Sequence, residues 1–281
     1  MPALRYYMEK KKVLIVTQEL KPYTTETIMS EIARALPQGI QENGMDIRIL
    51  MPRFGTINER RHRLHEVVRL SGMNIIVDDD DYPLIIKVAS LPGTRMQVYF
   101  LDNDDFFKRK FIFEDKAGKV YADNADRMAF FCKGALEIVK KFGWPPDIIH
   151  CHGWMTSLIP FFLKSAYANE PLFEMSKVVY SVYDQDYDQE FTKDFFAKAS
   201  INNLKEDDLA AYRYDDGVSL DLGALGYSDA IIRGDEELPE HVEEALKALD
   251  DKKPVLDFQE EGYIPSYIDL YNDLLAAEEV E

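Results

Sequence analysis

Residues 12–51 read KVLIVTQELKPYTTETIMSEIARALPQGIQENGMDIRILM, and this stretch decides the fold. It begins and ends with short apolar runs whose length and composition are typical of buried strands. The segment between them has apolar residues at helical spacing and then a stop signal at Asn43 and Gly44. The apolar residues of that segment are Ile28, Ile32, Ala35, Leu36 and Ile40. Strand, helix and strand in close succession predict a right-handed crossover, and so a Rossmann-like α/β fold with a parallel sheet flanked by helices.

The alternation of strand and helix continues beyond this stretch. A long helix is predicted over residues 122–142, because Gly143 follows it and two prolines lie shortly beyond. Shorter runs predict strands at residues 148–149, 177–183 and 229–232, and a helix at residues 158–167.

Residues 64–101 interrupt this alternation with short apolar runs separated by turn signals. The runs cover residues 65–70, 73–77, 84–89 and 96–101. We therefore expect a small antiparallel β insertion on the sheet. The acidic run 78–81 is interpreted as a charged hairpin tip and not as a divalent-ion site.

The predicted Rossmann-like domain comprises residues 1–234. Residues 235–281 form an acidic, helical tail with a break near Pro254 and a last helix over about residues 265–279. One face of that helix is apolar and needs a partner surface, so we expect it to pack back on the domain. The residues of this face are Ile264, Ile268, Tyr271 and Leu275.

Composition limits the classes of partner. The chain has 281 residues, with 33 Lys and Arg against 51 Asp and Glu, a formal net charge of −18. Nucleic acids and anionic membrane surfaces favour basic proteins, so a neutral glucan or a basic protein fits better. No run approaches the roughly 20 apolar residues of a membrane span, and no signal-peptide pattern is present, so a cytoplasmic location is predicted. Cys132 and Cys151, without a Cys-x-x-Cys pair, are predicted to be core thiols.

The candidate site is the run PDIIHCHGWMT at residues 146–156, where a strand leads into a helix through a polar corner. His150 and His152 point the same way along a strand, as a pair of metal ligands would. No third ligand is evident, so we interpret them as hydrogen-bonded core histidines and predict no metal and no cofactor. For Trp154, we weigh a core position against stacking on a sugar ring.

Asp184, Asp186 and Asp188 have the opening spacing of a calcium loop. The loop pattern then requires a glycine and a bidentate glutamate, whose places are taken by Gln189 and Phe195. We interpret the segment as a solvated acidic loop.

The run from His150 to Met155 resembles the His-x-His-Asp-Trp-His signature of bacterial glycogen synthases and plant starch synthases. Gly153 replaces the aspartate of that signature, and Met155 replaces its last histidine. Residues 12–55 are similar to the opening βαβ unit of the same family. Asp123, Asn124 and Arg127 match its Asp-Asn-x-x-Arg helix start, and residues 201–205 and 227–230 are similar to later segments. The resemblance covers roughly residues 12–232 and implies the N-terminal half of a two-domain GT-B glycosyltransferase.

The resemblance implies transfer of glucose from a nucleotide-sugar to the 4-hydroxyl end of an α-glucan. Three functional positions of the family fall on Thr25, Gly153 and Tyr183, where a lysine loop, an aspartate and a histidine are expected. None of the three can do the same charge or hydrogen-bonding work. His150, His152, Trp154, Asp123 and Asn124 match the family pattern and, with Asp184, are the candidates for residues lining a substrate cleft.

Two interpretations follow. In the first, the chain is a catalytically degenerate synthase-like domain that binds a partner protein or a glucan, because the donor-binding domain of the family is not in this sequence. In the second, it is an active glucosyltransferase that uses ADP- or UDP-glucose. That enzyme would be completed in trans or by chemistry rebuilt around His150, His152 and Asp184. The last predicted helix resembles the family's crossover helix, which returns to the N-terminal domain.

Overall fold

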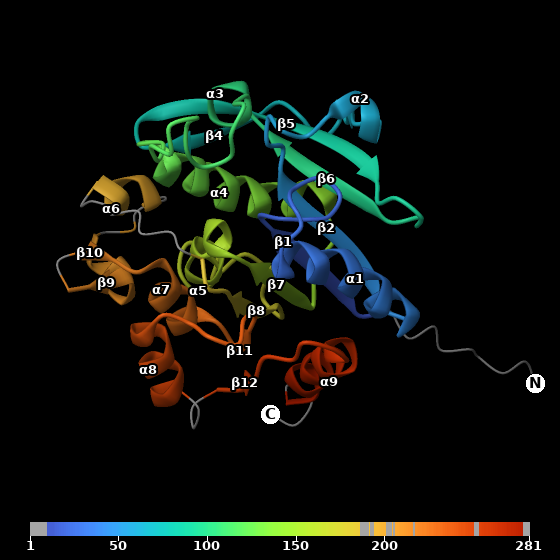
Figure 1. Ribbon diagram of the computed structural model, residues 1–281, viewed down its shortest axis with the longest axis vertical. Coiled ribbons are helices and arrows are strands. Elements are labelled where there is room, and N and C mark those ends of the chain that lie inside the picture. Colours follow the sequence, from blue (N-terminus) through green and yellow to red (C-terminus); the bar gives the residue numbers. More distant parts are fainter. Residues whose placement is uncertain are drawn as a thin grey trace, which may run out of the picture.

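The computed structural model describes residues 10–185, 191, 194–200, 204, 206–215, 217–249 and 253–277. Figure 1 shows one central sheet with helices on both sides of it.

The sheet has ten strands within the described residues, and nine of them form one continuous order. In that order they are β12 (Val255–Leu256), β11 (Ala230–Arg233), β8 (Lys177–Val182), β7 (Ile148–His152), β1 (Lys12–Thr17), β2 (Asp46–Pro52), β6 (Gln97–Asp102), β5 (Asp80–Ser90) and β3 (His65–Glu66). All neighbours from β12 to β6 are parallel. β5 is antiparallel to β6, to β3 and to β4 (Met73–Val77). The predicted α/β fold with a parallel sheet is therefore confirmed.

The helices form two layers. α1 and α9 contact each other, whereas α4 contacts α5, and α5 contacts α7, on the opposite face of the sheet. The α-helices are α1 (Ile28–Glu42), α2 (Glu59–His62), α3 (Asp104–Phe107), α4 (Asn124–Phe142), α5 (Leu158–Lys164), α6 (Asp194–Ala199), α7 (Leu220–Tyr227), α8 (Glu240–Leu249) and α9 (Tyr263–Ala276). Two 3₁₀ turns, η1 (Trp154–Thr156) and η2 (Glu206–Tyr212), and a small hairpin of β9 (Arg213–Tyr214) and β10 (Gly217–Val218) complete the described elements.

The first βαβ unit forms where the sequence predicts it. The Thr27 side chain accepts a hydrogen bond from the Ser30 N–H, and the Ser30 hydroxyl accepts one from the Thr27 N–H, so the start of α1 is capped. The helix ends at Asn43, and Gly44 follows with φ of +85°. β1 pairs with β2 in parallel register, and this pair forms the middle of the core.

The predicted insertion at residues 64–101 needs correction in two places. Its fourth strand, β6, pairs in parallel with β2 and thus belongs to the main sheet. Its first strand is only His65–Glu66, because the chain turns at residues 67–71 and hydrogen-bonds locally there. The turn at Asp78 and Asp79 joins β4 to β5, so the acidic run does form a hairpin tip.

The C-terminal segment returns to the sheet. After α8 the chain adds β12 beside β11, a short strand that directly follows Pro254 and that the sequence pattern did not indicate. α9 then packs on α1, where a Cβ atom at Gly39 would overlap the side chain of Ile264. Cys132 and Cys151 are free and buried, as predicted. Among the described residues, no helix is both long and apolar enough to cross a membrane.

Candidate functional site

The two histidines of the candidate site lie on β7, in the middle of the sheet between β1 and β8. His150 and His152 are two residues apart, so their side chains are on the same face. Their rings are 3.9 Å apart between centroids, and both residues are fully buried. The structure agrees with their interpretation as core histidines, and it places both inside the strand and not at the polar corner that follows it.

Hydrogen bonds from two other elements close this site. The Tyr271 hydroxyl, from α9, lies 2.6 Å from His150 Nδ1, and Ser181 Oγ of β8 lies 2.7 Å from His150 Nε2. The Tyr183 hydroxyl lies 2.8 Å from His152 Nδ1. We call these five residues the histidine–tyrosine corner. Every one of them is buried, so a substrate in solution has no access to either imidazole.

Burial sets the charge of the corner. Desolvation, together with the neighbouring His152 ring, holds the pKa of His150 well below its usual range. Burial alone lowers the pKa of His152 to about 3. Burial also raises the pKa of the Tyr183 and Tyr271 hydroxyls well above the ordinary tyrosine value. All four side chains are therefore neutral at pH 7. His152 Nε2 is buried and has no hydrogen-bond partner within the described part of the chain.

Gly153 follows directly in the chain with φ of +82° and ψ of 166°, a region that is essentially restricted to glycine. A Cβ atom here would lie 2.6 Å from Gln18 Oε1 and 2.7 Å from Met29 Cε. Gln18 Oε1 accepts a hydrogen bond from the Met155 N–H at 3.0 Å. The Gln18 side chain thus fills the space that any larger residue at position 153 would require.

Trp154 is only 4% exposed. Its ring packs on Phe113 at 4.9 Å and on Phe191 at 6.0 Å between centroids. The structure therefore supports a core position for Trp154 and not stacking on a sugar ring.

Asp123 and Asn124 lie at the start of α4 and hold the loop before it. The Arg109 guanidinium donates to the Asp123 carboxylate, with 2.8 Å from Nη1 to Oδ1. Asn124 donates to the Phe113 carbonyl at 2.9 Å and accepts from Arg127 Nη1 at 2.6 Å. Both side chains are occupied by contacts within the domain, and these contacts are with residues outside the histidine–tyrosine corner.

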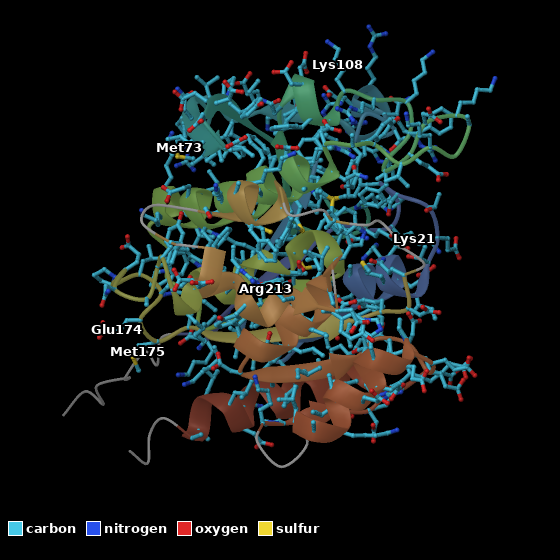
Figure 2. The ribbon with its side chains drawn as sticks, turned by 90° about the vertical axis from the view of Figure 1, so that its left-hand side faces the viewer. Lys21, Met73, Lys108, Glu174, Met175 and Arg213 are labelled. Atoms are coloured by element: carbon cyan, nitrogen blue, oxygen red, sulfur yellow. The ribbon has the colours of Figure 1, made fainter. Side chains whose placement is uncertain are left out.

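Thr25 is exposed in the loop before α1. The neighbouring Lys21 pairs with Glu26 at 3.1 Å and also with Glu31, and Figure 2 shows it at the surface beside α1. Hydrogen bonds that Lys21 donates to these two glutamates, Glu31 first, raise the pKa of Lys21. Near the start of α1, two carboxylates thus pair with a single lysine, and one negative charge remains in excess. This excess charge opposes the binding of a phosphate group at the helix start.

Asp184 is exposed beyond the end of β8 and lines a groove of about 620 Å³ at this edge of the sheet. Its backbone N–H donates to Asp235 Oδ2 at 2.7 Å. The other two aspartates of the calcium-like pattern, Asp186 and Asp188, lie outside the described residues. Within those residues, no group of three His, Cys, Asp or Glu side chains could hold a metal ion.

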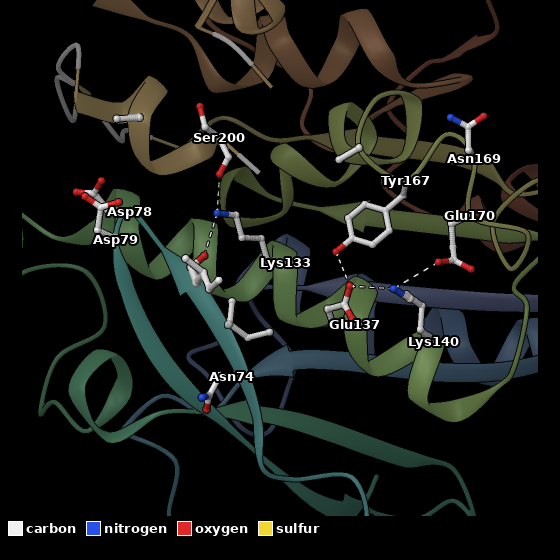
Figure 3. A pocket seen from close by; sticks show the side chains of 14 residues that line it. Asn74, Asp78, Asp79, Lys133, Glu137, Lys140, Tyr167, Asn169, Glu170 and Ser200 are labelled. Atoms are coloured by element: carbon white, nitrogen blue, oxygen red, sulfur yellow. Dashed lines mark hydrogen bonds and ion pairs between the residues drawn. The ribbon is translucent and has the colours of Figure 1, made fainter. Parts of the chain in front are cut away.

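A second hollow, of about 810 Å³, lies against α4 on the far side of the domain (Figure 3). Lys133 Nζ donates there to the carbonyls of Ile76 at 3.0 Å and Ser200 at 2.7 Å. Burial lowers the pKa of Lys133 to about 8. Nearby, Lys140 lies within ion-pair distance of two glutamates, one of which accepts the Tyr167 hydroxyl. The charged groups on α4 in this hollow are thus satisfied by the protein itself.

Sequence reasoning missed three residues of the corner and its surroundings. Gln18 follows β1 as an ordinary polar residue, and nothing in the pattern signals that it fills the space at Gly153. Ser181 is one of the alternating positions of the predicted strand at residues 177–183, and the pattern does not distinguish it from the others. Tyr271 was on the predicted apolar face of the last helix, but its hydrogen bond to His150 depends on how that helix docks.

The doubly wound parallel sheet, with polar groups gathered at the carboxyl ends of its central strands, defines one Rossmann-like half of a GT-B glycosyltransferase fold. The family model of the starch synthase catalytic domain matches residues 12–244. The chain therefore belongs to the starch synthase catalytic domain family.

Individual relatives agree with this assignment. The glycogen synthase of Chlorobaculum parvum is 32% identical over 252 residues, which cover 86% of this chain and 51% of the relative. The glycogen synthase of Pelodictyon phaeoclathratiforme is 40% identical over 174 residues, 62% of this chain and 36% of the relative. A structure of the catalytic domain of starch synthase IV from Arabidopsis thaliana, bound to ADP and acarbose, superposes with a TM-score of 0.72 at 18% identity. That superposition covers 89% of this chain and 51% of the other. The chain thus spans about a third to a half of the length of the curated relatives it matches.

Proposed function

We propose that this chain is a catalytically degenerate domain of the synthase family, which acts in α-glucan metabolism by binding a protein partner or a glucan. The observation that carries the proposal is the closed histidine–tyrosine corner. Tyr271 and Tyr183 cover the imidazoles at the place where α/β proteins of this topology hold their ligands. Neutral, buried imidazoles cannot exchange protons with a substrate that does not reach them.

The three family positions support the same proposal. Thr25 lies in a loop with an acidic helix start, where a nucleotide-sugar would need positive charge for its diphosphate. Gly153 has no side chain, and Gln18 fills the space beside it. The Tyr183 hydroxyl is hydrogen-bonded to His152 and is buried. If one such group contributes about 3 kcal/mol to lowering the barrier, loss of all three removes most of the rate enhancement.

The alternative is an active glucosyltransferase that a separate donor-binding chain completes in trans. It is favoured by the family assignment, since the starch synthase catalytic domain model matches residues 12–244. A partner chain would have to bring the cationic groups that the loop before α1 does not supply.

A transfer assay tests the proposal. The chain is incubated with ADP-glucose or UDP-glucose and maltooligosaccharides, with the Chlorobaculum parvum glycogen synthase as positive control. A second series adds the C-terminal half of that relative to the chain. We expect no transfer in either series. Transfer by the chain alone overturns the proposal, and transfer only in the mixture establishes the alternative.

Ligand binding is measured separately by thermal shift with ADP, ADP-glucose, UDP-glucose and maltoheptaose. A ligand at about 100 times its Kd stabilises the folded state by about 2.7 kcal/mol. We expect no shift with the three nucleotides. A shift with maltoheptaose identifies a glucan-binding role, and no shift with any compound leaves a protein partner as the ligand.

A further inference from the structure

The groove of about 620 Å³ beside Asp184 lies at the same edge of the sheet as the histidine–tyrosine corner. The start of α1, the turns after β8 and β11, and the segment that leads into α9 form its walls. In Figure 1, α9 lies next to α1, and β12 lies between α8 and α9. Unlike the corner, the groove is open to solvent.

The charge of the groove has one sign. Six carboxylates line it, and no lysine or arginine does so within the described part of the chain. These residues are Glu31, Asp184, Asp235, Glu236, Glu237 and Glu260. Glu31 pairs with Lys21, whereas none of the other five has a cationic partner among the described residues. Burial, and then the nearby Asp184 carboxylate, raises the pKa of Asp235. The carboxylates therefore repel one another, and among the described residues only Lys21, at Glu31, forms an ion pair with any of them.

The groove also has apolar walls. Ile28, the first residue of α1, is 48% exposed and so presents apolar surface beside the charged rim. Ile32, one turn further along α1, lines the same wall, and Phe258 and Tyr263 are half-buried on the segment that leads into α9. Water contacts this apolar surface in the free protein, so its coverage would be favourable.

We propose that this groove binds a segment of another protein in which lysine or arginine residues flank an apolar side chain. The apolar residue would pack between Ile28 and Phe258, and the basic groups would pair with the carboxylates of Glu236, Glu237 and Glu260. Charge complementarity selects this partner, because nucleic acids, nucleotide diphosphates and anionic membranes would be repelled. The inference rests on one part of the proposed function, namely that the chain binds a partner. It does not require that the chain has lost catalytic activity.

Fluorescence anisotropy tests the proposal with a labelled short peptide in which pairs of lysine and arginine flank a central Leu-Phe. A second peptide replaces Leu-Phe by Ser-Gly, and a third replaces the basic residues by glutamate. We expect saturable binding of the first peptide only, weakened at least about tenfold when salt rises from about 0.05 M to about 0.5 M.

Variants of the full chain locate the binding. E236Q/E237Q/E260Q removes three charges from the groove, and Ile28→Ser removes the exposed anchor surface. D80N/D81N/D105N removes three charges from another acidic hollow and is the matched control. Each groove variant should weaken binding by about tenfold or more, and the control by less than about twofold. Circular dichroism and the thermal midpoint verify that every variant is folded.

Three results would overturn the proposal: no saturable binding of the first peptide, equal binding of the peptide without an apolar centre, or equal weakening by the control variant. The last would mean that the whole acidic surface attracts basic peptides without a site. None of these results changes the outcome of the glucosyl-transfer assay, so the two proposals can fail separately.

Discussion

The histidine–tyrosine corner and the acidic groove occupy the same edge of one sheet, but their physical properties are opposite. In the corner, His150 and His152 are fully buried, neutral and hydrogen-bonded to tyrosine or serine hydroxyls. In the groove, carboxylates such as Glu236 and Glu237 are exposed, charged and without cationic partners among the described residues. The groups that are suited to proton transfer are inaccessible, and the groups that are accessible are suited to binding cations.

Under the proposed function, the two regions serve different purposes. The corner contributes to stability because its imidazoles and hydroxyls hydrogen-bond one another away from water, although His152 Nε2 has no partner among the described residues. We expect the groove to contribute little to stability and to leave its charges available to a partner. Four predictions test this division, beginning with the largest effect.

The largest effect is expected at Gly153. Gly153→Ala should lower the free energy of unfolding by about 4 kcal/mol, because backbone strain adds to overlap with Gln18 and Met29. Gly44→Ala is the control, since Gly44 also has positive φ but a Cβ atom there would meet no other atom within 4 Å. That control should lose only about 1 kcal/mol. Urea denaturation measures both, and equal losses would show that Gln18 does not restrict position 153.

The second effect is a loss of stability in acid through His152. Its folded pKa of about 3 lies below the unfolded value of about 6.5, so the unfolded chain binds the proton first. The stabilisation is complete above about pH 6.5 and is lost as the pH falls towards about 3. Between about pH 6.5 and about pH 5 this one group should cost about 2 kcal/mol. Urea denaturation at the two pH values measures how much unfolding free energy is lost between them. His152→Asn should lose about 2 kcal/mol less than the wild-type chain. An unchanged loss would place the imidazole in contact with water.

A smaller effect is expected from Tyr271→Phe, which removes the hydroxyl that reaches His150 from α9. One imidazole nitrogen is then buried without a partner, and the free energy of unfolding should fall by about 1–2 kcal/mol. Tyr263→Phe, on the same helix, is the matched control because Tyr263 is half-buried and borders the groove. It should change stability by less than about 0.5 kcal/mol. If both variants behave alike, α9 is held by apolar packing alone.

The smallest effect is expected in the groove. Asp235→Asn keeps an oxygen to accept the Asp184 N–H and removes a carboxylate whose pKa is raised by burial. Because the site is half exposed, the change at pH 7 should stay within about 0.5 kcal/mol, in the direction of stabilisation. A loss of more than about 1 kcal/mol would mean that the groove carboxylates serve the fold and not a partner.

Much of the fold could be predicted from local pattern. β1 and the end of α1 lie at the predicted residues, because apolar periodicity and the stop signal at Asn43 and Gly44 are encoded locally. The pairing of β6 with β2 could not be predicted, since a short apolar run has the same appearance in a parallel and an antiparallel pair. β12 was missed because two residues carry no periodicity.

For the candidate site, the sequence identified the residues but not their environment. The chain determined by itself a parallel α/β sheet, membership of a known family, and the changes at Thr25, Gly153 and Tyr183, because these depend on residue identity and order. Only the tertiary structure decided that Tyr271 closes the corner, that Gln18 fills the space at Gly153, and that carboxylates from four separate segments form one groove. Burial and long-range contact fix the charge and access of a side chain, and neither can be read from its neighbours in the chain.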